Sequence, residues 1–418
     1  MQRLEVSGGN RLRGTVSVGG AKNSVLPILA ATLINGGENV LHNCPDLRDV
    51  DSAIAILRHL GCTVEREGHT IRVDSSSITR CDVPDKLMRE MRSSVIFLGP
   101  ILARCGEALL SFPGGCELGP RPIDLHLDAL RKLGAVITER SGRIHCKAGD
   151  LRGRDILLSM PSVGATENTM LAATACNGVT RIINGAREPE ILDLQRFLQK
   201  AGAQVQGAGT GEIMVVGGGV RGDTKHRILP DRIETATYLC AAAACGGEIT
   251  VTDCEPGHVG TVVAQLAEGG ARFQVAGRTI RIQCDKRLGP IGPVRTMPYP
   301  GFPTDAQAQL MAAACTARGT TVFIENIFEN RYRHAAELLR MGARIRTSGR
   351  VALVEGSDRL LGADVTCTDL RGGAALVIAA LAAEGSSTIR EIHHIDRGYE
   401  KIENSFAGLG GEIRRIGD

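Results

Sequence analysis

The sequence predicts an α/β protein built from six repeats, which are grouped as two similar domains of three repeats each. A small–Gly–small signature recurs every 68 to 73 residues along the 418-residue chain, for example at Gly61, Gly134 and Gly202. Each signature closes an amphipathic helix, an apolar helix lies earlier in each repeat, and an alternating strand pair follows most of the signatures. Units of about 68 residues are too long for solenoid repeats, so three per globular domain is the compact arrangement.

The first helix of each repeat is apolar, and a glycine follows its last turn. Glycine is favoured there because it adopts the left-handed conformation of a helix C-cap without strain. These helices are expected at residues 24–33, 94–103, 167–175, 233–244, 306–317 and 373–383.

The second helix of each repeat is amphipathic, as residues 51–58 illustrate. Two alternating segments then follow, such as residues 62–67 and 70–73 with Gly68 in the turn. The repeat is therefore strand-helix-strand-helix-strand-strand. The change between domains is expected near residues 227–230, which predicts one domain at residues 21–229 and a second at residues 1–20 plus 230–418.

Composition excludes several classes of protein. The net charge of +3 and the 3% aromatic content argue against a nucleic-acid binder, which needs a basic surface and rings for base stacking. Thirteen cysteines without a CxxC pair indicate reduced thiols in a cytosol. The longest apolar run, residues 374–383, is too short to cross a membrane. No cofactor and no metal are expected.

Charged residues recur at the start of the apolar helices. Fourteen residues before each closing glycine stand Lys22, Arg92, Gly164, Arg232, Asp305 and Arg371. A helix N-terminus disfavours cations, so four cations there indicate that anions bind beside them.

A second set of positions lies thirteen residues before each signature glycine. Arg48, Arg121 and Arg397 occupy it in three repeats, and Arg331 lies close to it in the fifth. Arginine offers a planar fork to phosphate and carboxylate groups. An isolated arginine before a helix is more often a surface ion pair, and it is the recurrence that favours a ligand site.

One cysteine stands apart from the others. Cys116 follows Gly114 and Gly115, and Arg121 comes five residues later between two prolines. A thiol on a glycine-hinged loop near a guanidinium indicates chemistry on an anion. The alternative is a Gly/Pro turn that contains an incidental cysteine.

Several motifs together resemble one family. They are the Cys116 loop with residues 121–125 (RPIDL) and residues 19–24 (GGAKNS), 161–166 (PSVGAT), 230–235 (PDRIET), 304–309 (TDAQAQ), 327–331 (IFENR), 369–371 (DLR) and 396–400 (DRGYE). The sequence resembles the UDP-N-acetylglucosamine enolpyruvyl transferases, within the larger EPSP synthase family, from about Leu12 to the C-terminus.

The resemblance implies a pair of inside-out α/β barrels, a cytoplasmic enzyme and the first committed step of bacterial peptidoglycan synthesis. The implied reaction moves the enolpyruvyl group of phosphoenolpyruvate to the 3-hydroxyl of UDP-N-acetylglucosamine and releases phosphate. It proceeds by addition and then elimination, which require a general acid and a general base. Fosfomycin is the implied inhibitor, and no nucleic acid or membrane partner is implied.

The resemblance also implies roles for individual residues. Cys116 is the implied proton donor, forms a covalent phosphoenolpyruvate adduct and is the site of fosfomycin attack. Asp305 binds the sugar hydroxyl and handles its proton, and Lys22, Arg121 and Arg397 hold phosphoenolpyruvate. The remaining implied substrate-binding residues are Asn23, Arg92, Pro122, Ile123, Asp124, Leu125, Ser162, Val163, Gly164, Ile327, Asp369, Leu370 and Arg371. For Asp305 and Asp369, capping of the following helix is the alternative role.

Two other functions remain open at this point. 5-Enolpyruvylshikimate-3-phosphate synthase shares the implied fold and phosphoenolpyruvate, but it lacks a cysteine loop of this type. A non-catalytic nucleotide-sugar sensor on the same scaffold would be expected to lose Cys116, Asp305 or Lys22, and the sequence retains all three.

Overall fold

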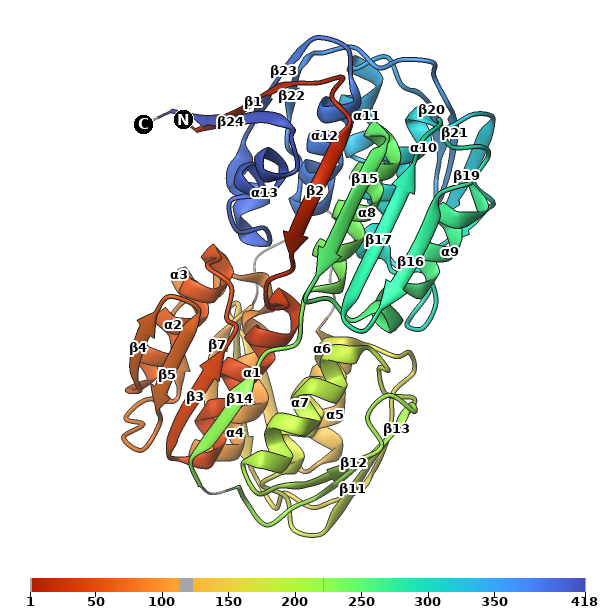
Figure 1. Cartoon of the computed structure of the whole chain (residues 1–418). Helices are drawn as coiled ribbons and strands as arrows, with labels where there is room; N and C mark the ends of the chain where they lie inside the picture. The colour runs from red at the N-terminus through yellow and green to blue at the C-terminus, as the bar shows by residue number, and fades with distance from the viewer. Residues whose placement is uncertain (1, 113–122, 221, 418) are drawn as a thin grey trace. The chain divides into compact units, whose positions relative to one another are not determined.

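The computed structural model describes residues 2–112, 123–220 and 222–417, which form two compact units (Figure 1). The described residues between 20 and 229 make up the first unit, and residues 2–19 and 230–417 make up the second. Each unit contains three four-stranded sheets. The predicted α/β fold class with six repeats is confirmed.

The first unit holds the first three repeats. Its helices are α1 (Lys22–Asn35), α2 (Arg48–Leu60), α3 (Asp85–Glu90), α4 (Leu98–Cys105), α5 (Asp124–Lys132), α6 (Val163–Ala173) and α7 (Pro189–Lys200), with a 3-10 helix η1 at Arg92–Phe97. Its strands are β3 (Glu38–His42), β4 (Thr63–Glu67), β5 (Thr70–Asp74), β6 (Asp82–Val83), β7 (Glu107–Ser111), β8 (Ala135–Arg140), β9 (Arg143–Ala148), β10 (Asp155–Leu157), β11 (Val179–Ile183), β12 (Gln204–Gln206), β13 (Glu212–Val216) and β14 (Thr224–Arg227).

The second unit holds the other three repeats and the N-terminal strands. Its helices are α8 (Arg232–Cys245), α9 (Gly260–Glu268), α10 (Thr304–Thr316), α11 (His334–Arg340), α12 (Leu370–Ala382) and α13 (Ile402–Gly408), with 3-10 helices η2 (Pro256–Val259) and η3 (Ile392–Arg397). Its strands are β1 (Arg3–Ser7), β2 (Leu12–Ser17), β15 (Gly247–Thr252), β16 (Arg272–Ala276), β17 (Thr279–Cys284), β18 (Val294–Arg295), β19 (Thr320–Ile324), β20 (Arg344–Ser348), β21 (Val351–Glu355), β22 (Asp364–Thr366), β23 (Ser386–Arg390) and β24 (Glu412–Ile416).

All six sheets share one pattern of pairing. An edge strand runs parallel to its neighbour, and the next two pairings are antiparallel, as in the order β6-β7-β9-β8. Strands distant in sequence complete three of the sheets. In the first unit β14 pairs with β3, and in the second unit β2 pairs with β15 while β1 lies between β23 and β24. The third repeat and the N-terminal segment therefore close the two units.

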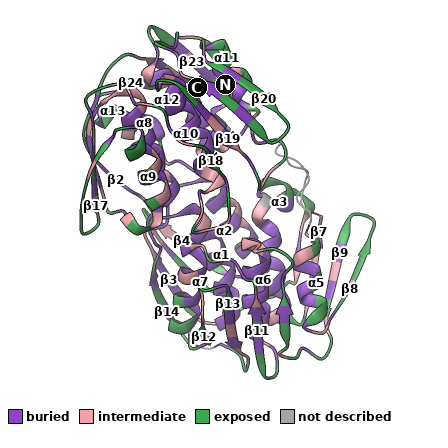
Figure 2. Cartoon of the chain, turned by 90° about the vertical axis from the view of Figure 1, so that its right-hand side faces the viewer, coloured by how far each residue is buried: buried purple, intermediate pink, exposed green. Residues whose placement is uncertain are grey.

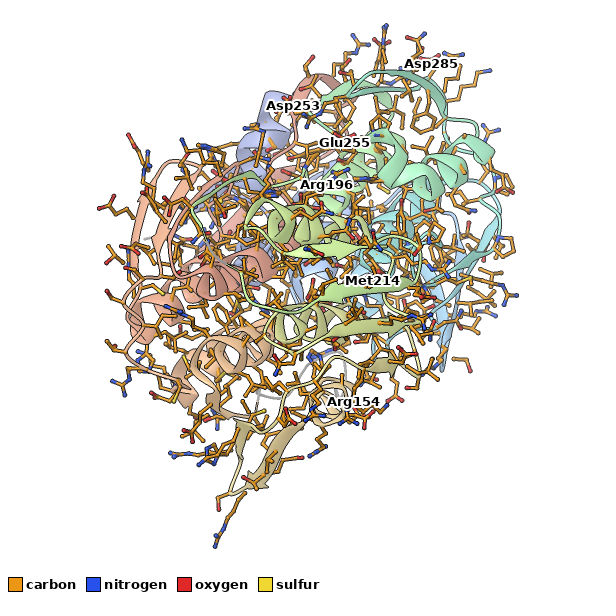
Figure 3. All side chains as sticks on the ribbon, turned by 90° about the horizontal axis from the view of Figure 1, so that it is seen from below. Arg154, Arg196, Met214, Asp253, Glu255 and Asp285 are labelled. Carbon is orange, nitrogen blue, oxygen red and sulfur yellow. The ribbon has the colours of Figure 1, made fainter. Side chains whose placement is uncertain are left out.

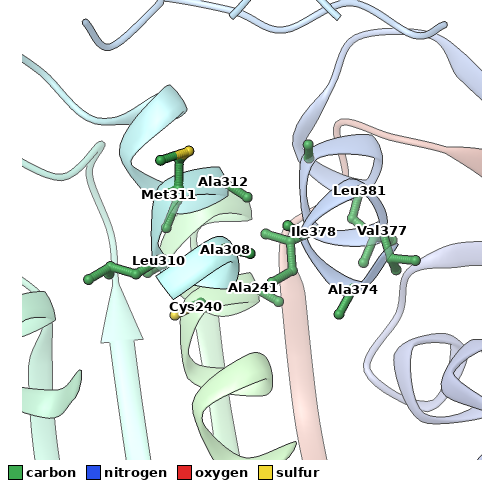
Figure 4. Packing of buried hydrophobic residues seen from close by; sticks show 14 of the residues in the cluster. Cys240, Ala241, Ala308, Leu310, Met311, Ala312, Ala374, Val377, Ile378 and Leu381 are labelled. Carbon is green, nitrogen blue, oxygen red and sulfur yellow. The ribbon is translucent and has the colours of Figure 1, made fainter. Parts of the chain in front are cut away.

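Three buried helices form the centre of each unit (Figure 2). In the second unit these are α8, α10 and α12, which contact one another through many alanines (Figure 4). Small side chains let helix axes approach closely while Leu310, Met311 and Ile378 fill the space around them. In the first unit the central helices are α1, α4 and α6, whose buried apolar residues include leucines and isoleucines as well as alanines.

Some predicted helix boundaries are wrong. The first helix of the second repeat starts as η1 and is α-helical only from Leu98. Pro100 has no N–H to donate to the preceding turn and is best accommodated in the first turn of an α-helix, which is consistent with this late start. Helix α6 starts four residues earlier than predicted, after Ser162 as N-cap. Helices α10 and α12 end at Thr316 and Ala382 with Ala317 and Ala383 as C-caps, so their closing glycines come two residues after the C-cap. Within the described part of the chain, no helix has both the length and the apolar character to cross a membrane.

Candidate active site

Lys22 and Asn23 start helix α1 in the first unit. The Lys22 ammonium is almost fully buried and lies 2.5 Å from the carboxylate of Asp49, in the first turn of α2. A Cβ on Gly20 would meet the carbonyl oxygen of Asn43 at 1.7 Å, so only glycine allows the chain to enter α1 along this path. A cation is thus held at the N-terminus of α1 by a neighbouring acidic side chain.

The segment Ser162 to Gly164 forms the start of α6, and all three residues are half-buried. The hydroxyl of Ser162 accepts a hydrogen bond from the backbone N–H of Ala165 at 3.4 Å, which caps the helix. A Cβ on Gly164 would lie 2.8 Å from the ring of His126. Gly164 therefore interrupts the series of charged helix starts because the His126 ring occupies the space a side chain would need.

His126 belongs to a buried network around Asn168 of α6. The Asn168 amide donates to His126 Nδ1 at 2.7 Å and to the carbonyl of Val95 at 2.9 Å, and it accepts from the N–H of Gly99 at 2.9 Å. Burial lowers the pKa of His126 to about 4, so the ring is neutral and its proton is on Nε2. This network joins the second and third repeats behind the start of α6.

Asp305 lies in the first turn of α10 in the second unit and binds two arginines. One carboxylate oxygen is 3.0 Å from the guanidinium of Arg331, and the other is 3.1 Å from that of Arg371. Helix α10 has no side-chain cap, so the structure excludes the capping role for Asp305.

The Asp305 carboxylate is the most accessible member of this cluster. Its side chain is 29% exposed, against 3% for Arg331 and 4% for Arg371. Burial raises the pKa of Asp305, but the charges of Arg371, Arg331 and Arg232 outweigh this effect and hold the pKa well below its usual range. An ionised carboxylate with two fixed cations behind it can accept a hydrogen bond from a hydroxyl group.

Asp369 caps helix α12 and so precedes Leu370 and Arg371. Its carboxylate accepts from the backbone N–H groups of Arg371 and Gly372, both at 3.0 Å, and these contacts show the capping role considered for this residue. Arg371 reaches back to Asp305 and also lies over the ring of Tyr399 at 5.6 Å from the ring centre. Asp369 therefore orients Arg371 through the helix backbone.

Arg397 ends the 3-10 helix η3 and is half-buried. A Cβ on the next residue, Gly398, would lie 2.7 Å from the Leu370 side chain. This close approach keeps Arg397 beside the start of α12.

Ile327 is placed by a residue that the motif search missed. Glu325, at the end of β19, is 1% exposed and accepts hydrogen bonds from the backbone N–H groups of Ile327 and Phe328 at 2.8 and 3.1 Å. Its second oxygen accepts from the hydroxyl of Thr304 at 3.0 Å. Glu325 therefore joins the Ile327 loop to the residue before Asp305.

Several predicted site residues have less structural context. Cys116, Arg121 and Pro122 lie outside the described residues. Arg92 starts η1, and nothing is described of its side chain. The N-cap of helix α5 and its first two residues are exposed or half-buried: Ile123, Asp124 and Leu125. Among the residues described, no cluster of three acidic, cysteine or histidine side chains is arranged to hold a metal ion.

A sequence model of the family described as EPSP synthase (3-phosphoshikimate 1-carboxyvinyltransferase) matches residues 6–406. The chain belongs to this family. Within the family, it is 50% identical to UDP-N-acetylglucosamine 1-carboxyvinyltransferase 2 of Caldanaerobacter subterraneus subsp. tengcongensis, over all of both chains. It is also 50% identical to UDP-N-acetylglucosamine 1-carboxyvinyltransferase 1 of Symbiobacterium thermophilum, over 99% of this chain and 95% of that protein.

Solved structures of the family share the fold. The enolpyruvyl transferase NikO from Streptomyces tendae superposes with a TM-score of 0.89 at 27% identity, over 99% of each chain. EPSP synthase from Acinetobacter baumannii superposes with a TM-score of 0.74 at 19% identity, over all of both chains. The second likeness concerns the fold alone.

Proposed function

We propose that this chain transfers the enolpyruvyl group of phosphoenolpyruvate to the 3-hydroxyl of UDP-N-acetylglucosamine and releases phosphate. The observation that carries the proposal is the 50% identity over the whole chain to a protein named for this activity. The alternative, 5-enolpyruvylshikimate-3-phosphate synthase, has less support because the similarity to the Acinetobacter EPSP synthase falls to 19% identity.

The reaction needs cations for the phosphate and carboxylate of phosphoenolpyruvate. We assign Lys22 and Arg397 to these groups, together with Arg121, and place Asn23 beside Lys22. The burial of the Lys22 ammonium supports this assignment, because a desolvated cation binds an anion more strongly than a hydrated one. In the free protein Asp49 balances that charge.

The sugar hydroxyl has to lose a proton as its oxygen attacks C2 of phosphoenolpyruvate. We assign Asp305 to this hydroxyl. Arg331 and Arg371 keep the carboxylate ionised and fix its direction. Its lowered pKa favours orientation of the hydroxyl over strong basicity in the free protein. We assign a further set of residues to the nucleotide sugar: Arg92, residues 121–125, Ser162, Val163, Gly164 and Ile327. We assign a position beside the reacting carbon to Asp369, Leu370 and Arg371.

Addition places a proton on the methylene carbon and a C–O bond on C2, which gives a tetrahedral ketal. Elimination removes a proton from the new methyl group as the C–O bond to phosphate breaks. We assign the proton delivery to Cys116. The described cysteines contrast with this role because burial raises their pKa values, to about 12 for Cys44, Cys62 and Cys146.

Fosfomycin tests the assignment of Cys116. Its phosphonate resembles the anion that Lys22, Arg121 and Arg397 are proposed to hold, which would position the epoxide for attack by the thiolate. Mass spectrometry of the treated protein should find one adduct, on the peptide that contains Cys116, and none in Cys116→Asp. Adducts on other cysteines, or full activity after long exposure, would contradict the assignment.

The proposed reaction is tested by phosphate release from phosphoenolpyruvate with two acceptors. UDP-N-acetylglucosamine should support turnover, and shikimate 3-phosphate should not. The reverse preference would replace the proposal with the EPSP synthase reaction, and turnover with neither acceptor would favour a nucleotide-sugar sensor. With the first outcome, we place the chain at the first committed step of peptidoglycan synthesis in the cytoplasm.

A further inference from the structure

A cavity of about 450 Å³ lies in the first unit between helix α7 and strand β14. It is lined by Asp193, Arg196, Gln199, Lys200, His226 and Arg227. None of these residues belongs to the candidate active site. Figure 3 labels Arg196 on α7 and also Arg154, an exposed arginine outside the cavity.

Three of the lining residues are exposed cations: Arg196, Lys200 and Arg227. The Arg196 and Arg227 side chains make no hydrogen bond or ion pair with any described residue. Arg196 and Lys200 are four residues apart on α7, a spacing at which like charges destabilise a helix. Lys200 lies in the last turn, where the helix dipole favours a cation, but Arg196 lies a turn earlier. A bound anion would relieve this repulsion.

The carboxylate that lines the cavity does not offset these charges at its surface. Asp193 is 3% exposed. One of its oxygens is 3.0 Å from His226 Nε2, and the other accepts from the Ser24 hydroxyl at 2.5 Å and the Leu229 N–H at 3.2 Å. Asp193 is thus fully engaged with partners behind the cavity.

A line of hydrogen bonds leads from the exposed Lys200 through buried side chains to helix α1. Lys200 Nζ lies 3.4 Å from His226 Nδ1. An ammonium can only donate, so Nδ1 accepts, and the His226 proton on Nε2 is donated to Asp193. Asp193 in turn binds Ser24, the residue that follows Lys22 and Asn23. The floor of the cavity is therefore connected to the start of α1.

We propose that this cavity binds a small phosphate-bearing anion through Arg196, Lys200 and Arg227, and that its occupancy is coupled to the start of α1 through His226, Asp193 and Ser24. Two guanidinium forks and one ammonium suit a phosphate group, and the volume suits a small ligand. A phosphate that binds Lys200 competes with His226 for the ammonium, which changes the hydrogen bonding of Asp193 and Ser24. Lys22 at the start of α1 is assigned to phosphoenolpyruvate, so an effect of occupancy on phosphoenolpyruvate binding rests on the proposed function, whereas the anion site itself does not.

Calorimetric titrations at low salt test the binding site. Inorganic phosphate and glycerol 3-phosphate are titrated into the full chain, the double variant Arg196→Gln/Arg227→Gln and the control Arg154→Gln. Arg154 is an exposed arginine of the same unit whose side chain has no partner among the described residues. We expect the double variant to lose at least tenfold in affinity for one class of sites, and the control to retain it. Isotherms that agree in all three proteins would overturn the proposal. Tighter binding of glycerol 3-phosphate would identify the ligand as an organic ester, and equal binding would identify the inorganic ion.

Nuclear magnetic resonance of the Ser24 amide tests the coupling. Addition of the anion should shift this amide in the full chain and in Arg154→Gln, and part of the shift should disappear in the double variant. An identical shift in the double variant would overturn the coupling, since it would come from an anion bound directly at α1. Neither readout depends on turnover, so a failure here is distinct from a failure of the proposed reaction.

Discussion

Asn168 of the first unit and Gln309 of the second occupy the same place in their repeats, four residues after Gly164 and Asp305. Both amides are completely buried, but they bind different partners. Asn168 binds His126 and the backbone of neighbouring segments. Gln309 donates to the hydroxyls of Thr237 and Tyr399 at 3.3 and 3.1 Å.

The two networks support helix starts of different character. Behind α6 the network is neutral and leaves a glycine and backbone groups at the helix start. Behind α10 the Tyr399 ring lies against Arg371, which belongs to the ionised cluster around Asp305. The third repeat thus has a glycine and backbone groups at this helix start, and the fifth repeat has a carboxylate. The comparison teaches that one position of the repeat can hold either a glycine or a charged side chain, and that the buried side chains behind it differ accordingly.

The largest expected effect is that of Asp305→Asn in the charged network. If the carboxylate handles the hydroxyl proton, kcat should fall by about 10²–10⁴-fold, the usual range for loss of a general acid or base. Steady-state kinetics at saturating substrates measures it. Asp364→Asn, which alters an exposed pair with Arg390, is the control and should keep wild-type kcat. An Asp305→Asn kcat within threefold of wild type would reduce Asp305 to a structural partner of the arginines.

The next largest effect is on stability in mild acid, and each unit contributes one histidine. Burial lowers the pKa of His126 and of His334 to about 4. Because the unfolded chain binds these protons near pH 6.5 and the folded chain does not, stability falls as the pH drops from about 6.5 to 4, by up to about 3 kcal/mol per histidine. Thermal unfolding of His126→Asn and His334→Asn should depend less on pH over this range than that of the wild type. The exposed His393→Asn serves as the control, and equal pH dependence in all four proteins would contradict the prediction.

A substitution at Gly164 tests why the third repeat lacks a side chain at this helix start. Gly164→Ala forces a Cβ against the His126 ring, and overpacking of this kind costs about 1–3 kcal/mol. We expect a lower melting temperature and weaker binding of UDP-N-acetylglucosamine. In a His126→Ala background, where the ring is absent, Gly164→Ala should lower the melting temperature by less than it does in the wild type. Additive effects in this cycle would show that the two residues do not interact.

The smallest expected effect is a difference in stability between variants that lack one or the other of the two buried amides. Asn168→Ala leaves the Gly99 N–H and the Val95 carbonyl without this partner, and an unpaired buried group costs about 1–3 kcal/mol. Gln309→Ala removes an amide whose oxygen has no partner among the described residues, so its loss should be about 1 kcal/mol smaller. Hydrogen exchange resolved by segment compares the two variants, since two units need not unfold together. Equal destabilisation would remove the distinction drawn between the networks.

The sequence by itself determined the six repeats and the α/β class, because helix and strand periods and closing glycines are local properties of the chain. It also marked Lys22, Asp305 and Arg371 as unusual, since charges at the start of apolar helices stand out without any structure. Their roles remain predictions. The two sets of recurring charged positions could be found for the same reason, and Arg331 was found because it lies close to the second set in its repeat.

Only the tertiary structure determined which groups contact these charged side chains and the residues around them. Glu325 follows a strand and carries no motif of its own, yet it binds the Ile327 loop and Thr304 because β19 ends beside α10. Gly164 is the one uncharged residue in the series of helix starts. The structure explains it, because the ring of His126, 38 residues away in the chain, occupies the space of a side chain. Asp305 and Asp369 look alike as residues at the start of apolar helices, but only Asp369 is a cap. Asp305 is held by Arg331 of its own repeat and by Arg371 of the next repeat. Contacts between repeats depend on how the helices pack, and local sequence periodicity does not contain that information.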